Sequence, residues 1–182
     1  MTEVRGSLWG SSTPAGPVGV ISGALSGAWA GFIGGGVMIV VMMCLYFTGS
    51  QGFWEPPKII GSMLLGPGAV FGGAGAVVFG LFWHMVLAMG FGALFGAAMA
   101  LFFGRRQPVV VTLILGVIYS GLIWALSQPA VLLALTPWVA QNLVPWIFRG
   151  GLVLYGLTLG GVPTSYQREW ATKYLPAPLQ RR

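Results

Sequence analysis

His84 and Arg149 are the two side chains whose type and place could support chemistry inside an apolar segment. His84 is the only histidine, and Arg149 lies within an apolar run near the carboxyl end. Ionisable groups inside a membrane are costly, so each is a candidate functional residue. His84 could be an axial ligand to the metal of a haem or a chlorophyll-type pigment, a proton-responsive group, or a hydrogen-bond donor to a quinone headgroup. The alternative is a structural imidazole, bonded to a hydroxyl or carbonyl of a neighbouring helix.

Arg149 also has two interpretations. A long arginine near the end of an apolar run can extend to the membrane surface. It can instead form a lipid-headgroup or anion site, with Glu55 as a counter-ion on the same side of the membrane. Lys58 is a simpler partner for Glu55, because it lies three residues further along the chain.

The remaining residue types supply no catalytic or metal-binding set. The chain has no aspartate and one cysteine, Cys44, and its three glutamates all lie outside the long apolar runs. A single histidine rules out a bis-histidine haem, and a catalytic triad or dyad lacks partners. We therefore expect no enzyme, no metal site, and a buried, structural Cys44.

The composition identifies the class of protein that must position these residues. Only 7% of the 182 residues are charged and 56% are hydrophobic, whereas soluble domains carry about 25% charged residues. The apolar blocks are long enough for helices that cross a bilayer. The net charge of +6 comes from residues scattered at the ends of these blocks, so we expect contact with lipid and no nucleic-acid partner.

The predicted fold is an all-α, polytopic membrane protein with four transmembrane helices. Apolar runs bounded by glycine, proline and charged residues place the spans near residues 18–48, 73–103, 109–127 and 143–162. Two shorter apolar segments, 59–71 and 130–142, are expected to lie in the interface or to re-enter the membrane. Residues 1–17 form an extended arm before the domain of residues 18–162, and residues 163–182 form a basic tail with a short interfacial helix near 166–175.

The distribution of basic residues predicts the orientation of these spans. With four spans, both termini and the loop after the second span lie on one side. That side holds seven basic residues, whereas Lys58 is the only one in the two opposite loops. The positive-inside rule therefore places both termini in the cytoplasm.

Small residues recur every four positions along three of the predicted spans. This spacing places them on one face of a helix and lets another backbone approach closely. We expect the first two faces to pack on each other, or one of them to dock on another protein. The predicted packing residues are Gly19, Gly23, Gly27, Gly31 and Gly35, then Gly80, Ala88, Gly92 and Gly96, which share a line with His84, and finally Gly156 and Gly160.

Three stretches of the chain resemble small four-span inner-membrane proteins of bacteria that have no established function. They are the Gly-Phe-Trp-x-Pro-x-Lys-Ile-Ile-Gly-Ser-x-Leu-Leu-Gly sequence at 52–66, the glycine-rich span at 84–96, and Leu-Tyr-Gly-Leu-x-Leu-Gly at 154–160. The resemblance implies a bacterial inner-membrane location and a four-span layout. It implies no reaction.

Two functions fit these observations. The first is a non-catalytic accessory or assembly subunit of a larger membrane complex, of the electron-transfer or photosynthetic type, that docks on other integral membrane subunits through its glycine faces. The second is a small transporter or channel that works as a homo-oligomer, with the short apolar segments as re-entrant elements.

Overall fold

The computed structural model describes residues 16–49, 51–103, 107–127 and 136–162, and its regular structure over these ranges is entirely helical. The predicted all-α class is therefore confirmed. Three helices are long and apolar enough to cross a membrane: α1 (Pro17–Thr48), α3 (Ala74–Phe102) and α4 (Val109–Leu126). Each begins and ends within one residue of its predicted bounds. The fourth long helix, α7 (Pro145–Gly161), has 17 residues and corresponds to the predicted span at 143–162.

Prolines begin the shorter helices. Helix α2 (Glu55–Leu65) has two prolines in its first turn, and α6 (Pro137–Asn142) begins with one. Proline is well placed there, because the first amides of a helix have no intrahelical acceptor. Gly66, with φ of 85°, ends α2 in a conformation that favours glycine, and a 3-10 turn, η1 (Pro67–Phe71), leads into α3.

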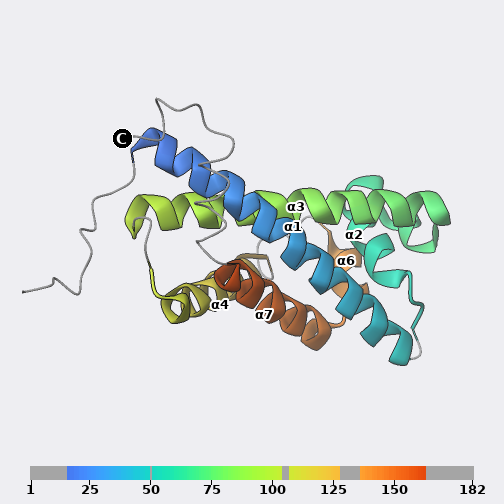
Figure 1. Ribbon diagram of the computed structural model, residues 1–182. Coiled ribbons are helices and arrows are strands. Elements are labelled where there is room, and N and C mark those ends of the chain that lie inside the picture. Colours follow the sequence, from blue (N-terminus) through green and yellow to red (C-terminus); the bar gives the residue numbers. More distant parts are fainter. Residues whose placement is uncertain (1–15, 50, 104–106, 128–135, 163–182) are drawn as a thin grey trace, which may run out of the picture.

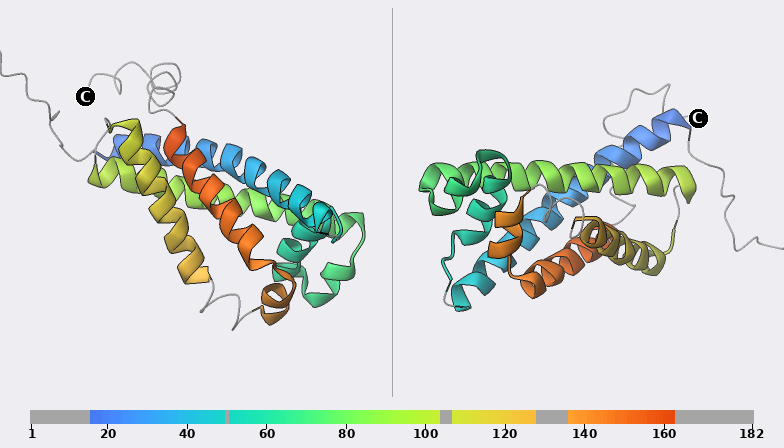
Figure 2. Two further views of the ribbon diagram at one scale, coloured as in Figure 1. Left: turned by 90° about the horizontal axis from the view of Figure 1, so that it is seen from below. Right: turned by 180° about the vertical axis from the view of Figure 1, so that it is seen from behind.

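The four long helices pack as two pairs (Figure 1). Helix α1 crosses α3 in an antiparallel sense, since Gly23 lies beside Gly96 and Gly35 lies beside Ala88. Helix α4 packs on α7, and α7 also packs on α1. In both views of Figure 2, α2 lies beside the amino-terminal part of α3, close to α6.

The main core lies where α1, α7 and the short helices meet. Its most buried large side chains include Met42 and Tyr46 of α1, Ile59 of α2 and Val139 of α6. The expectation for Cys44 was wrong, because this residue is exposed on α1, two positions away from Met42 and Tyr46. A position on an apolar helix is not a core position where the surrounding solvent is lipid.

The predicted amino-terminal arm and the predicted interfacial helix near 166–175 lie outside the described residues, except that α1 begins at Pro17.

Candidate functional site

Glycine residues form the contact between α1 and α3. A Cβ atom built on Gly27 would overlap the carbonyl oxygen of Gly92 and lie 2.9 Å from both Cα and N of Gly96. All of these atoms are backbone, so no side-chain movement could make room. The same close approach recurs along α1, at Gly23, Gly31 and Gly35, and the more terminal Gly19 is also buried.

The small residues of α3 have two partner helices. Ala88, Gly92 and Gly96 face α1, whereas Gly80 faces α2, where an added Cβ would overlap the carbonyl of Pro57 and lie 3.1 Å from the nitrogen of Gly61. A spacing of four drifts slowly around a helix, so the two ends of one small-residue line reach different neighbours. Sequence spacing could not reveal this division.

Glycines also bring α4 and α7 together. A Cβ on Gly156 would lie 2.6 Å from Oγ of Ser120 and 2.9 Å from the carbonyl carbon of Gly116. A Cβ on Gly160 would lie 2.5 Å from Cα of Leu113. The glycine faces of α1, α3 and α7 are thus occupied by other helices of the same chain.

His84 lies in the seam between α1 and α3 and is 7% exposed. Its Nε2 lies 3.0 Å from the carbonyl oxygen of Gly35, to which it donates a hydrogen bond. This geometry is that of the structural imidazole, because the partner is a plain backbone carbonyl. Ligation of a haem or chlorophyll-type pigment through this nitrogen, or a hydrogen bond from it to a quinone, would require the bond to Gly35 to break. This nitrogen is therefore not available to such a group in the structure, since Nε2 faces the backbone of α1.

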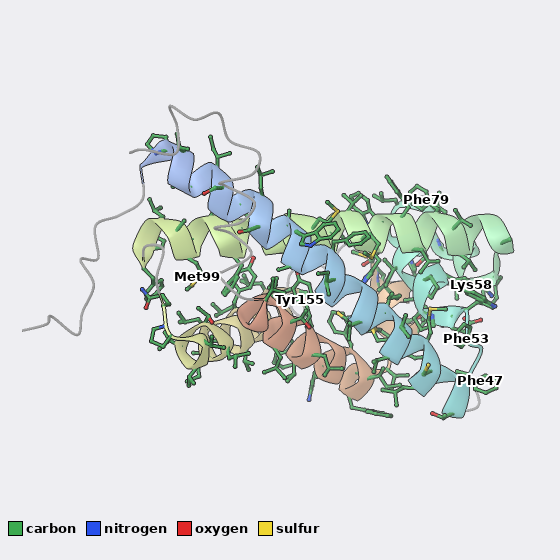
Figure 3. The ribbon with its side chains drawn as sticks, viewed as in Figure 1. Phe47, Phe53, Lys58, Phe79, Met99 and Tyr155 are labelled. Carbon is green, nitrogen blue, oxygen red and sulfur yellow. The ribbon has the colours of Figure 1, made fainter. Side chains whose placement is uncertain are left out.

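Hydroxyl groups of tyrosine and threonine also donate hydrogen bonds to backbone carbonyls of neighbouring helices. Tyr155 of α7, labelled in Figure 3, donates to the carbonyl of Ala88 in α3 at 2.5 Å. Thr112 of α4 donates to the carbonyl of Gly160 in α7 at 2.7 Å. The α1–α3 contact, through His84, and the α4–α7 contact, through Thr112, each combine a close glycine approach with a hydrogen bond from a side chain, and Tyr155 adds a bond from α7 to α3. Sequence reasoning assigned these hydroxyls no role, although an isolated Thr or Tyr in an apolar run is a signal for such a bond.

Tyr119 of α4 forms a similar hydrogen bond to α3. Its hydroxyl donates to the carbonyl of Phe91 in α3 at 2.9 Å, and its ring lies 5.3 Å from that of Phe95. Tyr119 therefore holds α4 against α3, in addition to the contact of α4 with α7.

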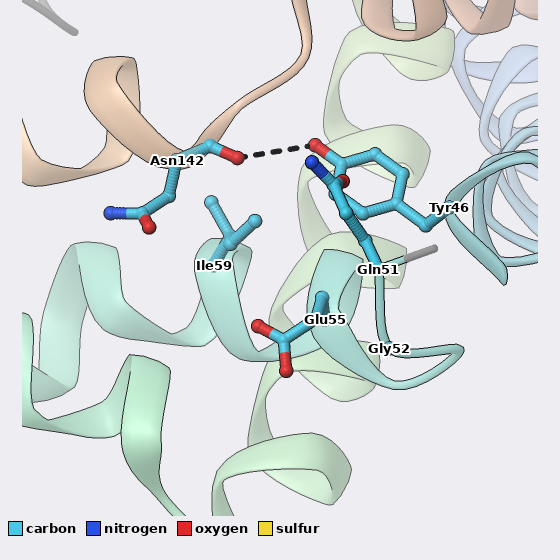
Figure 4. Close-up of a pocket in the computed structure, with 6 residues that line it drawn as sticks. All are labelled: Tyr46, Gln51, Gly52, Glu55, Ile59 and Asn142. Carbon is cyan, nitrogen blue, oxygen red and sulfur yellow. Dashed lines mark hydrogen bonds between the residues drawn. The ribbon is translucent and has the colours of Figure 1, made fainter. Parts of the chain in front are cut away.

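A polar cavity of about 250 Å³ lies where α1, α2 and α6 meet (Figure 4). Its lining residues are Tyr46, Gln51, Gly52, Glu55, Ile59 and Asn142. The Tyr46 hydroxyl accepts a bond from the amide of Val144 at 2.8 Å and lies 3.3 Å from the carbonyl oxygen of Asn142. Tyr46 thereby holds the chain between α6 and α7 in place, so this cavity is lined partly by a structural contact.

Glu55, which also lines this cavity, pairs with Lys58. Their charged groups lie 3.2 Å apart within the first turn of α2, and both side chains are partly exposed. An ion pair of this kind contributes little to stability. Of the two partners considered for Glu55, the structure brings Lys58 to it, and Arg149 has a different neighbour.

Arg149 lies against a tryptophan. Its guanidinium carbon is 4.6 Å from the ring centroid of Trp124 of α4, a distance typical of a cation–π contact. Both residues line a second cavity, of about 240 Å³, between α4 and α7. The other lining residues are Val117, Ser120, Gly121, Leu152 and Val153.

Comparison with protein-family models, curated proteins and solved structures gives no match for the chain. The resemblance to four-span bacterial proteins therefore stays a prediction. Within the described ranges, no group of three or more His, Cys, Asp or Glu side chains is placed to hold a metal ion. What the geometry provides is a set of tightly packed helices, with two small cavities at their edges.

Proposed function

We propose that the protein is a non-catalytic accessory or assembly subunit of a larger membrane complex. The observation that carries this proposal is the use of the buried polar side chains. Ser62, His84, Thr112 and Ser120 each bond to a backbone carbonyl, and Tyr155 does the same. The bonds of His84, Thr112 and Tyr155 join different helices, whereas those of Ser62 and Ser120 lie within one helix and Thr136 Oγ1 has no partner among the described residues. The three bonds between helices support a structural role for these side chains.

The surface of α4 supports docking on another subunit. Helix α4 packs mainly on α7 and reaches α3 through Tyr119, and 17% of the residues in its most apolar window are buried. The corresponding share is 50% for α1. A helix with so much apolar surface outside the monomer suits contact with lipid or with a partner helix. The glycine faces are engaged inside the chain, so we propose docking through the exposed aliphatic faces instead.

The homo-oligomeric transporter or channel receives less support. A transport path needs polar groups along a cavity that crosses the bundle. Two cavities between the described helices are small, at about 250 and 240 Å³, and the one beside Arg149 is lined largely by apolar side chains. The transporter or channel is therefore the alternative function, and flux measurements with the pure protein would reveal it.

The proposed arrangement in the membrane has α7 as the fourth span and both termini in the cytoplasm of a bacterium. The apolar length of α7, about 25 Å at 1.5 Å per residue, suffices for a thin or locally adapted bilayer. Reporter fusions after Arg106 and after Arg182 should both report the cytoplasm. A periplasmic signal at either position would refute this arrangement.

The decisive experiment is purification from native membranes in a mild detergent, followed by native mass spectrometry. We expect the chain to be recovered with other integral membrane proteins in fixed stoichiometry. A homogeneous species that contains this chain alone would count against the proposal. Ion or solute flux into liposomes that contain only the pure protein would favour the transporter.

A further inference from the structure

We propose that the cavity between α4 and α7 is a binding site for one glycerophospholipid with a net negative headgroup. In this site Arg149 binds the phosphate and the apolar walls hold part of an acyl chain. The inference rests on the proposed membrane arrangement of α7, but it does not depend on a partner subunit.

The shape of the site follows from how α4 and α7 pack. The helices touch most closely at Gly116 and Gly156, where an added Cβ on either residue would overlap the other backbone. Beyond this contact, toward Trp124 and Arg149, the cavity of about 240 Å³ opens between them. In Figure 2 the same two helices lie further apart at this end. A single chain of an acyl group suits such a narrow space between two diverging helices.

The walls of the cavity are suited to hydrocarbon. Val117, Leu152 and Val153 supply aliphatic surface, and Gly121 leaves open space, since nothing lies within 4 Å of the place where its Cβ would be. The one hydroxyl of the lining, on Ser120, already donates to the carbonyl of Val117 at 2.9 Å. Apart from Arg149 at its mouth, the lining offers one unpartnered polar group, the buried indole N–H of Trp124.

The charge at the mouth selects the headgroup. Arg149 is the only charged residue that lines the cavity, and it forms no ion pair with any described residue. Its guanidinium carbon lies over the Trp124 ring at 4.6 Å, and the guanidinium carries five N–H donors that a phosphate can use. Arginine binds a phosphate through two parallel hydrogen bonds. A zwitterionic headgroup would bring an ammonium to a site whose lining has no carboxylate.

The depth of Arg149 matches the level of lipid phosphates. Arg149 lies four residues after the start of α7, and Trp124 lies two residues before the end of α4. Trp146, in the first turn of α7, is 63% exposed. Tryptophan is enriched at the boundary between the hydrocarbon and the headgroups, so these residues mark that boundary for the α4–α7 pair.

Native mass spectrometry of the full-length protein tests the site directly. Phosphatidylglycerol and phosphatidylcholine with the same acyl chains are titrated into the delipidated protein in detergent. We expect the wild type to bind phosphatidylglycerol about tenfold more tightly, because both lipids offer a phosphate to Arg149 but phosphatidylcholine also brings an ammonium close to this cation, where the lining has no carboxylate. Arg149→Gln should reduce this preference to about one, whereas the matched control Lys58→Gln should retain it. An unchanged preference in Arg149→Gln would overturn the proposal.

The acyl part of the site has its own variant. Gly121→Leu fills the open space and should lower the affinity for both lipids, while Gly90→Leu, at an equally open position on α3, should not. Inorganic phosphate at millimolar concentration should leave the bound lipid in place. Displacement by phosphate, or unchanged lipid affinity in Gly121→Leu, would show that no acyl chain is held there. Since Arg149 and Gly121 are both exposed, their variants should fold, and thermal unfolding checks this.

Discussion

The substitution Gly35→Ala offers the sharpest test of the seam between α1 and α3. A Cβ at Gly35 would lie 2.5 Å from Cβ of Ala88, whereas the next nearest atoms, His84 Nε2 and Met85 Sδ, are at 3.6 and 3.7 Å. Carbon atoms pack best at about 3.5–4.0 Å, so the added methyl overlaps one other methyl by about 1 Å. Overpacking of this size destabilises a core by about 1–3 kcal/mol.

A second substitution should remove this clash. Ala88→Gly deletes the only atom that the new methyl overlaps, so the double variant Gly35→Ala/Ala88→Gly should regain most of the lost stability. The coupling free energy between the two positions should be about 1–3 kcal/mol in favour of the double variant. The contact between α1 and α3 then holds the same number of methyl groups as in the wild type, but the methyl group is on α1 instead of α3.

Gly27→Ala provides the contrast. Its new methyl would meet only backbone atoms, of Gly92 and Gly96, which no substitution can remove. Gly27→Ala should therefore stay destabilised when it is combined with Ala88→Gly. Gly36→Ala is the matched control on the same helix, because nothing lies within 4 Å of its Cβ position, and it should be as stable as the wild type.

The assay is reversible unfolding of the full chain in mixed micelles, by titration with dodecyl sulfate and detection by tryptophan fluorescence. The reasoning would be refuted if Gly35→Ala were as stable as Gly36→Ala. It would also be refuted if Ala88→Gly rescued Gly27→Ala as well as Gly35→Ala, since that result would indicate general loosening of the seam.

Three further predictions concern the hydrogen bonds. Thr112→Val should lower the free energy of unfolding by about 0.6–1.7 kcal/mol through loss of a bond between helices, whereas Ser26→Ala, which loses a bond within one helix, should change it less. Equal losses in the two unfolding titrations would contradict this. Tyr46→Phe should cost about 1–3 kcal/mol, because a backbone amide loses its acceptor, and faster hydrogen exchange at the start of α7 should accompany the loss. His84→Leu should lower stability and leave the visible spectrum of the purified protein unchanged; loss of a visible band would instead show that a pigment or haem is bound there.

The sequence predicted the long helices well, and it could not predict their partners. Apolar length and the glycine or proline residues at the ends determine a span locally, so α1, α3 and α4 lie within one residue of their predicted bounds. The partner of His84 lies 49 residues away, and its identity depends on the register of α1 against α3. Register comes from packing between helices, which no local pattern encodes.

Helix α2 shows a different kind of error. The short apolar segment was predicted to begin at residue 59, after Pro56 and Pro57, because proline breaks a helix when it occurs in the interior. At the first turn the same residues favour a helix, and α2 begins there. Gly66 and Pro67 lie within the predicted segment 59–71, and the structure divides the segment there, since α2 ends before them. The Arg149–Trp124 contact was missed because the two residues belong to different helices, although a cation and a tryptophan at span ends were both visible.

The pairing of helices has a consequence for how the chain is made. Helices α1 and α3 follow one another with only the short α2 and η1 between them, and α6 is the only helix among the residues that are described between α4 and α7. The two close glycine contacts between long helices, α1 with α3 and α4 with α7, therefore each join helices that leave the ribosome one after the other. The first hairpin can close before the second has been synthesised, and α7 then joins the two by packing Gly151 against Met38 of α1. The late encounters between the two hairpins are then made by α7, through Gly151 and Tyr155, and by α4, through Tyr119.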